Sequence, residues 1–137
     1  MATTSKSARP AHMKHRSIEL TGDPQRAPAR AMLRAMGLTR DDLDKPFVAI
    51  ANLASDVTPC NVHLDRFAKA VKEGVRAADG IPFEFGTITI SDGISMGTEG
   101  MKASLVSREV IADSIEVVTF GERMDGLIAV GDRKSVV

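Results

Sequence analysis

The sequence contains no tryptophan, no tyrosine and one cysteine, and its charges balance. A single cysteine cannot form a disulfide within the chain, which fits a reducing compartment, so we expect a cytoplasmic protein. Five phenylalanines are the only aromatic residues, which argues against a stacking platform for single-stranded nucleic acid. Lys+Arg and Asp+Glu each number 18, so the formal net charge of zero favours neither nucleic acid nor an acidic partner.

Long hydrophobic runs are also missing. No stretch reaches about 18 apolar residues, so no membrane span is predicted. The start of the chain carries Lys6, Arg9, Lys14 and Arg16 with no acid and no apolar segment, which excludes a secretory signal. We expect residues 1–17 to form a flexible N-terminal arm, with a short transit peptide as the alternative.

The length of 137 residues and the apolar share of 43% fit a single domain. Short apolar runs predict three strands, at Phe47–Ala54, Phe83–Ile90 and Asp125–Gly131. Good helix formers or an apolar face predict helices at Arg26–Met36, from Leu64 to before Gly80 and Pro82, and at Ser104–Phe120. In the middle helix the predicted buried face is Leu64, Phe67, Ala68, Val71 and Val75. Thr39 with Asp42 predicts a capped turn before the first strand.

Strands that alternate with helices predict βαβ crossovers and a parallel sheet. The expected fold class is α/β: a partial α/β/α layered domain with a parallel sheet of about three strands (βαβαβ), preceded by short helices. Because such crossovers are right-handed almost without exception, the loops that leave the carboxyl ends of the strands share one edge. Ligands of open α/β sheets bind at that edge.

Each predicted strand leads into a loop with candidate ligands. Cys60 lies in "VTPCNVHLDR", Asp92 lies in "SDGISMGTEG", and residues 131–134 follow the third strand. A thiolate suits iron or zinc, whereas a carboxylate suits magnesium or manganese. One thiolate cannot hold an iron–sulfur cluster, because such clusters take several cysteine ligands. The residues at this edge therefore form half of a metal site.

Each of these residues also has a plainer interpretation. Cys60 could be an incidental loop cysteine, and Asp92 could bond its own backbone in a turn. His63 could join Cys60 at a metal or be an ordinary residue of the first helical turn. The glycine-rich loop could cradle a phosphate, although it lacks the P-loop and dinucleotide spacings. Thr98 and Glu99 could simply begin the helix.

Nearly all of the sequence between residues 16 and 131 follows one known pattern. It contains "RAPARAMLRAMGLTRDDLDKPFVAIAN", "TPCNVHLDRFAKAVKEGVRAADGIPFEFGTITISDGISMGTEGMKASLVSREVIADSIE" and "DGLIAVG". These segments resemble the N-terminal portion of the dihydroxy-acid dehydratase family. The stretches "TPCN" and "SDGISMGTEGM" distinguish that family from the phosphogluconate and sugar-acid dehydratases.

The resemblance implies a hydro-lyase of branched-chain amino-acid biosynthesis. Such a lyase converts 2,3-dihydroxy-3-methyl carboxylates to 2-oxo acids, the precursors of valine, leucine and isoleucine. The implied partner is this small-molecule substrate, with no nucleic acid and no membrane, and family members form homodimers. The implied cofactors are Mg²⁺, bound by Asp92, and an iron–sulfur cluster, bound by Cys60, for which we favour 2Fe-2S over 4Fe-4S.

The loop after the third strand departs from the family pattern. The family continues after "AVG" with Gly-Cys-Asp-Lys, whose cysteine is a cluster ligand and whose aspartate and carbamylated lysine bind magnesium. Here the sequence reads "GDRKSVV", with Arg133 in the place of the cysteine. Allowing one gap keeps Lys134 as the magnesium-binding lysine. The catalytic serine lies further along the family chain, so no catalytic residue is assigned here.

We therefore expect a partial copy of the enzyme. Residues 1–17 are the arm, residues 18–131 an incomplete N-terminal α/β domain and residues 132–137 an atypical tail, with the C-terminal domain absent. We expect neither cofactor to be retained, no dehydratase activity for the chain alone, and exposed apolar surface at the third strand. Two alternatives stay open: a fragment of a sugar-acid or phosphogluconate dehydratase, and a small α/β module that binds a phosphate ligand.

Overall fold

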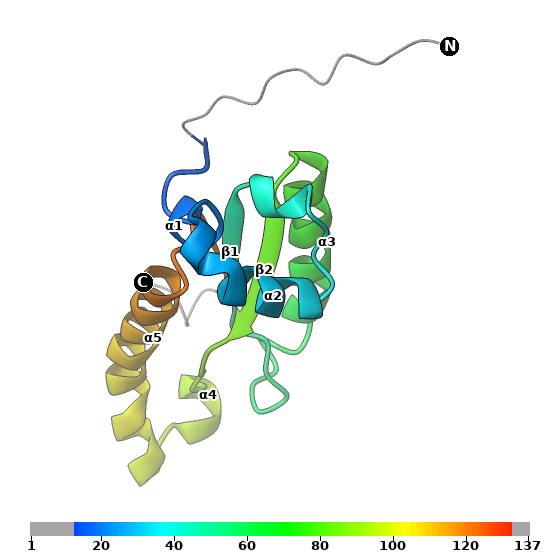
Figure 1. Cartoon of the computed structure of the whole chain (residues 1–137). Helices are drawn as coiled ribbons and strands as arrows, with labels where there is room; N and C mark the ends of the chain where they lie inside the picture. Colours follow the sequence, from blue (N-terminus) through cyan, green and yellow to red (C-terminus); the bar gives the residue numbers. More distant parts are fainter. Residues whose placement is uncertain (1–12, 133–137) are drawn as a thin grey trace.

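The computed structural model describes residues 13–132 of the chain (Figure 1). Its centre is a three-stranded sheet in the order β2-β1-β3, in which both pairs of neighbours are parallel. The strands span Phe47–Asn52 (β1), Ile81–Gly86 (β2) and Gly126–Val130 (β3). The predicted α/β class and its parallel three-stranded sheet are confirmed.

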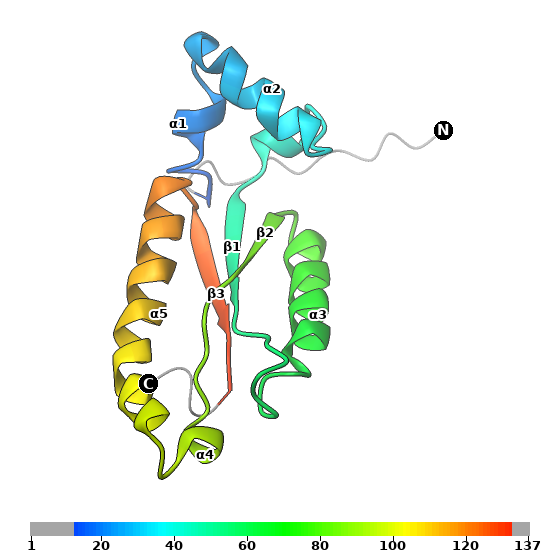
Figure 2. The ribbon, with the colours of Figure 1, turned by 90° about the horizontal axis from the view of Figure 1, so that it is seen from below.

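Helices precede the sheet and connect its strands. Those before the sheet are α1 (Ile18–Thr21), η2 (Pro24–Arg26), α2 (Ala27–Ala35) and η3 (Asp42–Asp44). Those between strands are α3 (Leu64–Ala77), α4 (Asp92–Ser95), η4 (Glu99–Met101) and α5 (Lys102–Gly121). Figure 2 shows α3 on one side of the strands and α5 on the other, so the sheet lies between two helices. Within residues 13–132, none of the helices has the length and apolar character needed to cross a membrane.

The central strand β1 forms the middle of the core. Its Phe47, Ala49, Ile50 and Ala51 are between 0% and 1% exposed. One core cluster joins strands, α3 and α5, and contains Ile50, Leu53, Leu64, Ile111 and Val130. A second cluster, Leu43, Phe47, Ala49 and Met124, packs with residues that include Leu33 of α2 and Phe83 of β2. The N-terminal helices are thereby fixed to the amino half of the sheet.

The predicted bounds of the second strand are wrong. The strand begins earlier, at Ile81, and it ends at Gly86 rather than at Ile90. Pro82, which we expected to stop the preceding helix, lies inside β2. It is tolerated there because, among residues 13–132, β2 pairs with β1 alone and is therefore an edge strand.

The predicted buried face of α3 is confirmed except at one position. Leu64, Ala68 and Val75 are buried, and Val71 is partly buried and packs against the core, whereas Phe67 is 55% exposed. The Phe67 ring instead meets the ring of His63 edge to face, with 5.4 Å between the ring centroids. Phe67 lies at the margin of the buried stripe of α3. Its position on the helix, rather than its apolar side chain, therefore determines that it is exposed.

Candidate functional site

The carboxyl ends of the three strands meet at one edge of the sheet. In the strand register Asn52 lies opposite both Gly86 and Val130. Beyond the strands, Leu53 N donates to Val130 O at 3.0 Å and Thr87 N donates to Asn52 O at 3.1 Å. Figure 2 shows α4 and the loop between β1 and α3 at the same end of the molecule. The predicted common edge is therefore present.

Cys60 lies in the turn between β1 and α3, with its side chain exposed. The next residue, Asn61, is buried, and its Nδ2 donates to Leu53 O at 2.7 Å. Within the turn, Asn61 N donates to Thr58 O at 3.1 Å, and Leu64 N donates to Asn61 O at 3.1 Å. A buried amide thus holds the turn against the end of β1, and this anchoring leaves the neighbouring thiol at the surface.

The same turn contains a buried hydroxyl. Thr58 is 2% exposed, and its Oγ1 makes no hydrogen bond within the part of the chain that the structure describes. Buried hydroxyl groups in proteins are normally bonded. The turn therefore holds a polar atom whose partner residues 13–132 do not supply.

Asp92 is the first residue of α4 and is partly buried. The Oγ of Ser91, the N-cap, accepts a hydrogen bond from Ile94 N at 3.4 Å. The hydroxyl of Ser104, a buried residue of α5, donates to Asp92 Oδ1. The carboxylate is thus carried by α4 and bonded by a residue of α5. This contact with a second helix goes beyond the plainer interpretation, in which Asp92 bonds only the backbone of its own turn.

Thr98 and Glu99 begin the helical region before α5, as one of the sequence interpretations expected. Thr98 is the N-cap of η4, and its Oγ1 accepts a hydrogen bond from Gly100 N at 3.2 Å. The Glu99 carboxylate pairs with the Lys102 ammonium group. His63 packs on Phe67, which supports its interpretation as an ordinary residue at the start of α3.

Asn52 links the three elements around the edge. It is 4% exposed, and its Nδ2 donates to Glu84 Oε1 of β2 at 2.8 Å and to Asp65 Oδ1 of α3 at 3.2 Å. Its Oδ1 accepts from Ala54 N at 2.9 Å, which fixes the start of the loop that carries the thiol. The Lys72 ammonium group, followed by the Asn52 amide, lowers the pKa of the Glu84 carboxyl.

Sequence reasoning missed three residues that organise this edge. These are Asn52, Asn61 and Ser104, each of which is buried and bonded to another segment. Only Asn52 carried a usable signal, because it is a polar residue at the end of an apolar strand. The other two look like ordinary loop and helix residues in the sequence.

The donors at the edge do not form a complete metal site. Within residues 13–132, no group of three Cys, His, Asp or Glu side chains lies close enough to hold a metal ion. Cys60 is the single thiol of the sequence, so the donor set does not fit an iron–sulfur cluster. Lys134 lies outside the described residues. The structure thus brings Cys60 and Asp92 to one edge without closing a coordination shell.

An open parallel sheet with a thiol-bearing turn and a helix-starting carboxylate at its carboxyl edge defines an α/β domain with a ligand-binding edge. The family model described as dihydroxy-acid/6-phosphogluconate dehydratase N-terminal matches residues 45–133. The chain belongs to this family. The matched region contains the three strands and the loops that carry Cys60 and Asp92.

Curated proteins show the same similarity. The dihydroxy-acid dehydratase of Haloarcula marismortui is 62% identical over 116 residues, which are 85% of this chain and 20% of the relative. That of Natronomonas pharaonis is 64% identical over 115 residues, 84% of this chain and 19% of the relative. That of Koribacter versatilis is 60% identical over 126 residues, 92% of this chain and 22% of the relative. The chain spans about a fifth of the length of the curated relatives it matches.

Proposed function

We propose that this chain supplies the N-terminal part of a dihydroxy-acid dehydratase of branched-chain amino-acid biosynthesis. The reaction is the removal of water from a 2,3-dihydroxy-3-methyl carboxylate to give a 2-oxo acid. The observation that carries the proposal is the identity of 60% to 64% over 115 to 126 residues of this chain. The compared relatives are named dihydroxy-acid dehydratases, which favours this substrate class over phosphogluconate.

In this proposal Cys60 gives one thiolate to an iron–sulfur cluster and Asp92 gives one carboxylate to Mg²⁺. The exposure of the thiol on an anchored turn supports the first role, and the positioning of Asp92 by Ser104 supports the second. Lys134 stays proposed as the carbamylated magnesium ligand. The described residues supply too few donors for a cluster, so the remaining ligands must come from other residues, and no catalytic step is assigned to this chain.

The proposal extends to location and assembly. We propose a cytoplasmic protein, because the single exposed cysteine suits a reducing compartment. We also propose that the whole enzyme forms a homodimer that binds its small-molecule substrate, as in the family that the sequence resembles. Sedimentation of the enzyme assembled as described below tests the dimer.

The first experiment uses the polypeptide of 137 residues. It is incubated with iron and sulfide under anaerobic conditions, and its visible absorbance and 2-oxo acid formation are measured. We expect no stable cluster and no turnover, because a single thiolate cannot secure the cluster. Turnover by this polypeptide would show that its donor set is complete after all.

The second experiment tests the function itself. Residues 45–131 replace the matching segment of the Haloarcula marismortui relative, and the chimera is assayed with a dihydroxy acid and with 6-phosphogluconate. We expect dehydration of the dihydroxy acid, and loss of the cluster absorbance in Cys60→Ser. Val57→Ala, a change at a 68% exposed residue of the same loop, is the matched control and should keep the absorbance. A chimera that dehydrates 6-phosphogluconate instead would support the alternative substrate class.

A further inference from the structure

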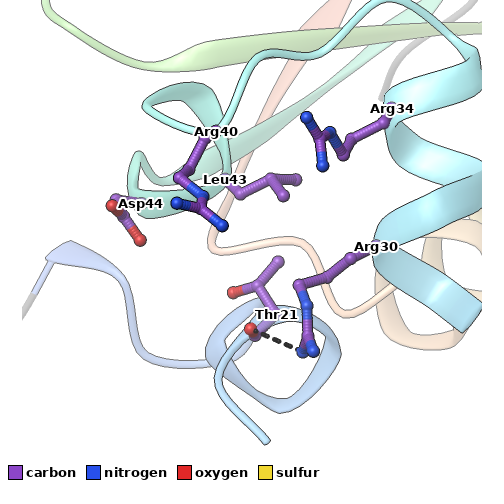
Figure 3. Close-up of a pocket in the computed structure, with 6 residues that line it drawn as sticks. All are labelled: Thr21, Arg30, Arg34, Arg40, Leu43 and Asp44. Atoms are coloured by element: carbon purple, nitrogen blue, oxygen red, sulfur yellow. Dashed lines mark hydrogen bonds between the residues drawn. The ribbon is translucent and has the colours of Figure 1, made fainter. Parts of the chain in front are cut away.

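A pocket lies at the amino end of the sheet, away from the carboxyl edge. It is a pocket of about 320 Å³ lined by Thr21, Arg30, Arg34, Arg40, Leu43 and Asp44 (Figure 3). The pocket lies between α1, α2 and η3, and η3 ends at Asp44, just before β1 begins at Phe47. Its volume is at the lower end of the range of small-molecule sites, about 300–1,000 Å³.

The lining of this pocket is strongly positive. The lining contains three guanidinium groups and one carboxylate, and the sequence between residues 24 and 40 contains four arginines and no acid. The nearby Asp42 is engaged elsewhere, because its carboxylate bonds Thr39 and pairs with Lys45. Like charges four residues apart, such as Arg30 and Arg34, repel each other on a helix. The set therefore carries an unfavourable charge that a bound anion would offset.

Two of the arginines, Arg30 and Arg34, come from α2, and Arg40 comes from the facing turn. Within residues 13–132, Arg30 is fixed by carbonyl groups alone: its Nη1 donates to Thr21 O at 3.2 Å and to Asp23 O at 2.5 Å, and its Nη2 donates to Pro24 O at 3.3 Å. No carboxylate among these residues therefore neutralises its charge. Figure 3 shows the guanidinium groups of Arg34, from α2, and Arg40, from the facing turn, on opposite sides of Leu43. In the described part of the chain, neither Arg34 nor Arg40 forms a hydrogen bond or an ion pair through its side chain.

We propose that this pocket binds a phosphate group, either as the free ion or carried by a small molecule. Guanidinium forks match the geometry of phosphate oxygens and keep their charge at any physiological pH. The lining carries a net charge of two positive from its three guanidinium groups and one carboxylate, which suits a phosphate dianion. Buried Leu43 supplies an apolar floor. The site is independent of the proposed dehydratase chemistry, since it uses none of the residues at the carboxyl edge.

The test is titration of the 137-residue chain with inorganic phosphate at constant ionic strength, followed by calorimetry and by amide shifts in NMR spectra. We expect saturable binding at one site, with shifts concentrated in residues 21–44. Arg34→Gln and Arg40→Gln should each weaken binding about tenfold, the loss of one charge-assisted hydrogen bond. Parallel titrations with glycerol phosphate and acetate identify the source of the phosphate group: the tighter of the two phosphate ligands is the one recognised, and acetate should bind at least about tenfold more weakly.

Two further variants make the result decisive. Arg26→Gln removes the same charge from the same helical region but lies outside the pocket lining, so it should change the affinity less than about twofold. Asp44→Asn removes the competing carboxylate and should tighten binding several-fold, an effect that unfolding cannot produce. Binding without saturation, equal affinity for acetate, an equal loss in Arg26→Gln, or no gain in Asp44→Asn would each overturn the proposal. Circular dichroism of every variant verifies that the chain is folded.

Discussion

Phe47 and Asp125 exchange two hydrogen bonds across the amino ends of β1 and β3. Asp125 N donates to Phe47 O at 2.8 Å, and Phe47 N donates to Asp125 Oδ2 at 2.8 Å. Asp125 Oδ1 also accepts from the backbone N–H groups of His15, Arg16 and Ser17, at 3.0, 2.7 and 3.0 Å. One carboxylate, 3% exposed, therefore joins the N-terminal segment to two strands.

Asp125→Ala should be strongly destabilising. The substitution leaves the N–H groups of Phe47, Arg16 and Ser17 without their acceptor, and we expect the free energy of unfolding to fall by about 2–4 kcal/mol. Urea denaturation followed by circular dichroism measures the loss. Asp113→Ala, at an exposed position of α5, is the control and should change stability by less than about 0.5 kcal/mol. Equal losses in both variants would show that the Asp125 contacts contribute little.

The same carboxylate predicts a loss of stability in acid. Burial of Asp125 opposes its ionisation, but hydrogen bonds from Ser17, Phe47 and Arg16 outweigh burial and lower its pKa from 3.8 to about 2. Because the pKa is depressed by folding, the stabilisation is fully present above pH 3.8 and is lost as the pH falls through about 2. Thr39 and Lys45 lower the pKa of Asp42 to about 2 as well, so Asp42 acts in the same direction.

Denaturation of the wild-type chain and of Asp125→Asn between pH 5 and pH 2 tests this origin of the acid sensitivity. The variant has no carboxyl group to protonate at this position. The difference in stability between the two chains should therefore shrink as the pH falls. A difference that stays constant down to pH 2 would assign the acid sensitivity to other groups.

Asn52→Asp should destabilise the carboxyl edge in a pH-dependent manner. The substitution places a third carboxylate, at a position that is 4% exposed, beside those of Asp65 and Glu84. We expect a loss of about 2–3 kcal/mol at pH 7, because a buried polar contact becomes a repulsion between like charges. The loss should become smaller at pH 4, where carboxylates begin to take up protons. Asn52→Ala removes the same amide without adding charge. Because this amide helps to lower the pKa of Glu84, the loss in Asn52→Ala should also become smaller at pH 4, but it should change with pH less than the loss in Asn52→Asp.

The main elements could be predicted because each follows from a local pattern. The apolar run that starts at Phe47 became β1, and the spacing of Leu64, Ala68 and Val75 predicted the buried face of α3. The reciprocal hydrogen bonds between Thr39 and Asp42 confirm the predicted cap. Parallel topology alone then placed the Cys60 and Asp92 loops at one edge.

The remaining features depend on contacts between distant segments. Ser104 supports Asp92 only because α5 runs back past α4, and nothing in the sequence around Ser104 indicates this contact. Pro82 looks like a helix stop, and it is a strand residue only because β2 forms the edge of the sheet. A role that arises from the packing of two elements is absent from the sequence pattern of either one.

The outer face of α5 carries several exposed apolar side chains. Val106, Val110, Val117 and Phe120 follow one side of the helix and are 61%, 45%, 69% and 69% exposed. Exposed Asp113 lies on the same side, between Val110 and Val117. Large apolar patches are uncommon on monomeric soluble proteins. We therefore expect the chain to bind a hydrophobic dye and to self-associate at high concentration, as judged by dye fluorescence and light scattering.

Two lysine substitutions on this face of α5 should reduce dye binding without destabilising the fold. In the double variant Val106→Lys/Val117→Lys the dye fluorescence should fall by about half, because the charges divide the exposed stripe. The free energy of unfolding should change by less than about 0.5 kcal/mol per substitution, since both side chains already face solvent. Val57→Lys is the matched control, at an equally exposed valine of the β1–α3 loop, and should leave the dye signal unchanged. If the double variant bound as much dye as the wild type, the dye-binding surface would lie elsewhere. Exposed Leu127 and Ile128 of β3 would then be the next residues to substitute.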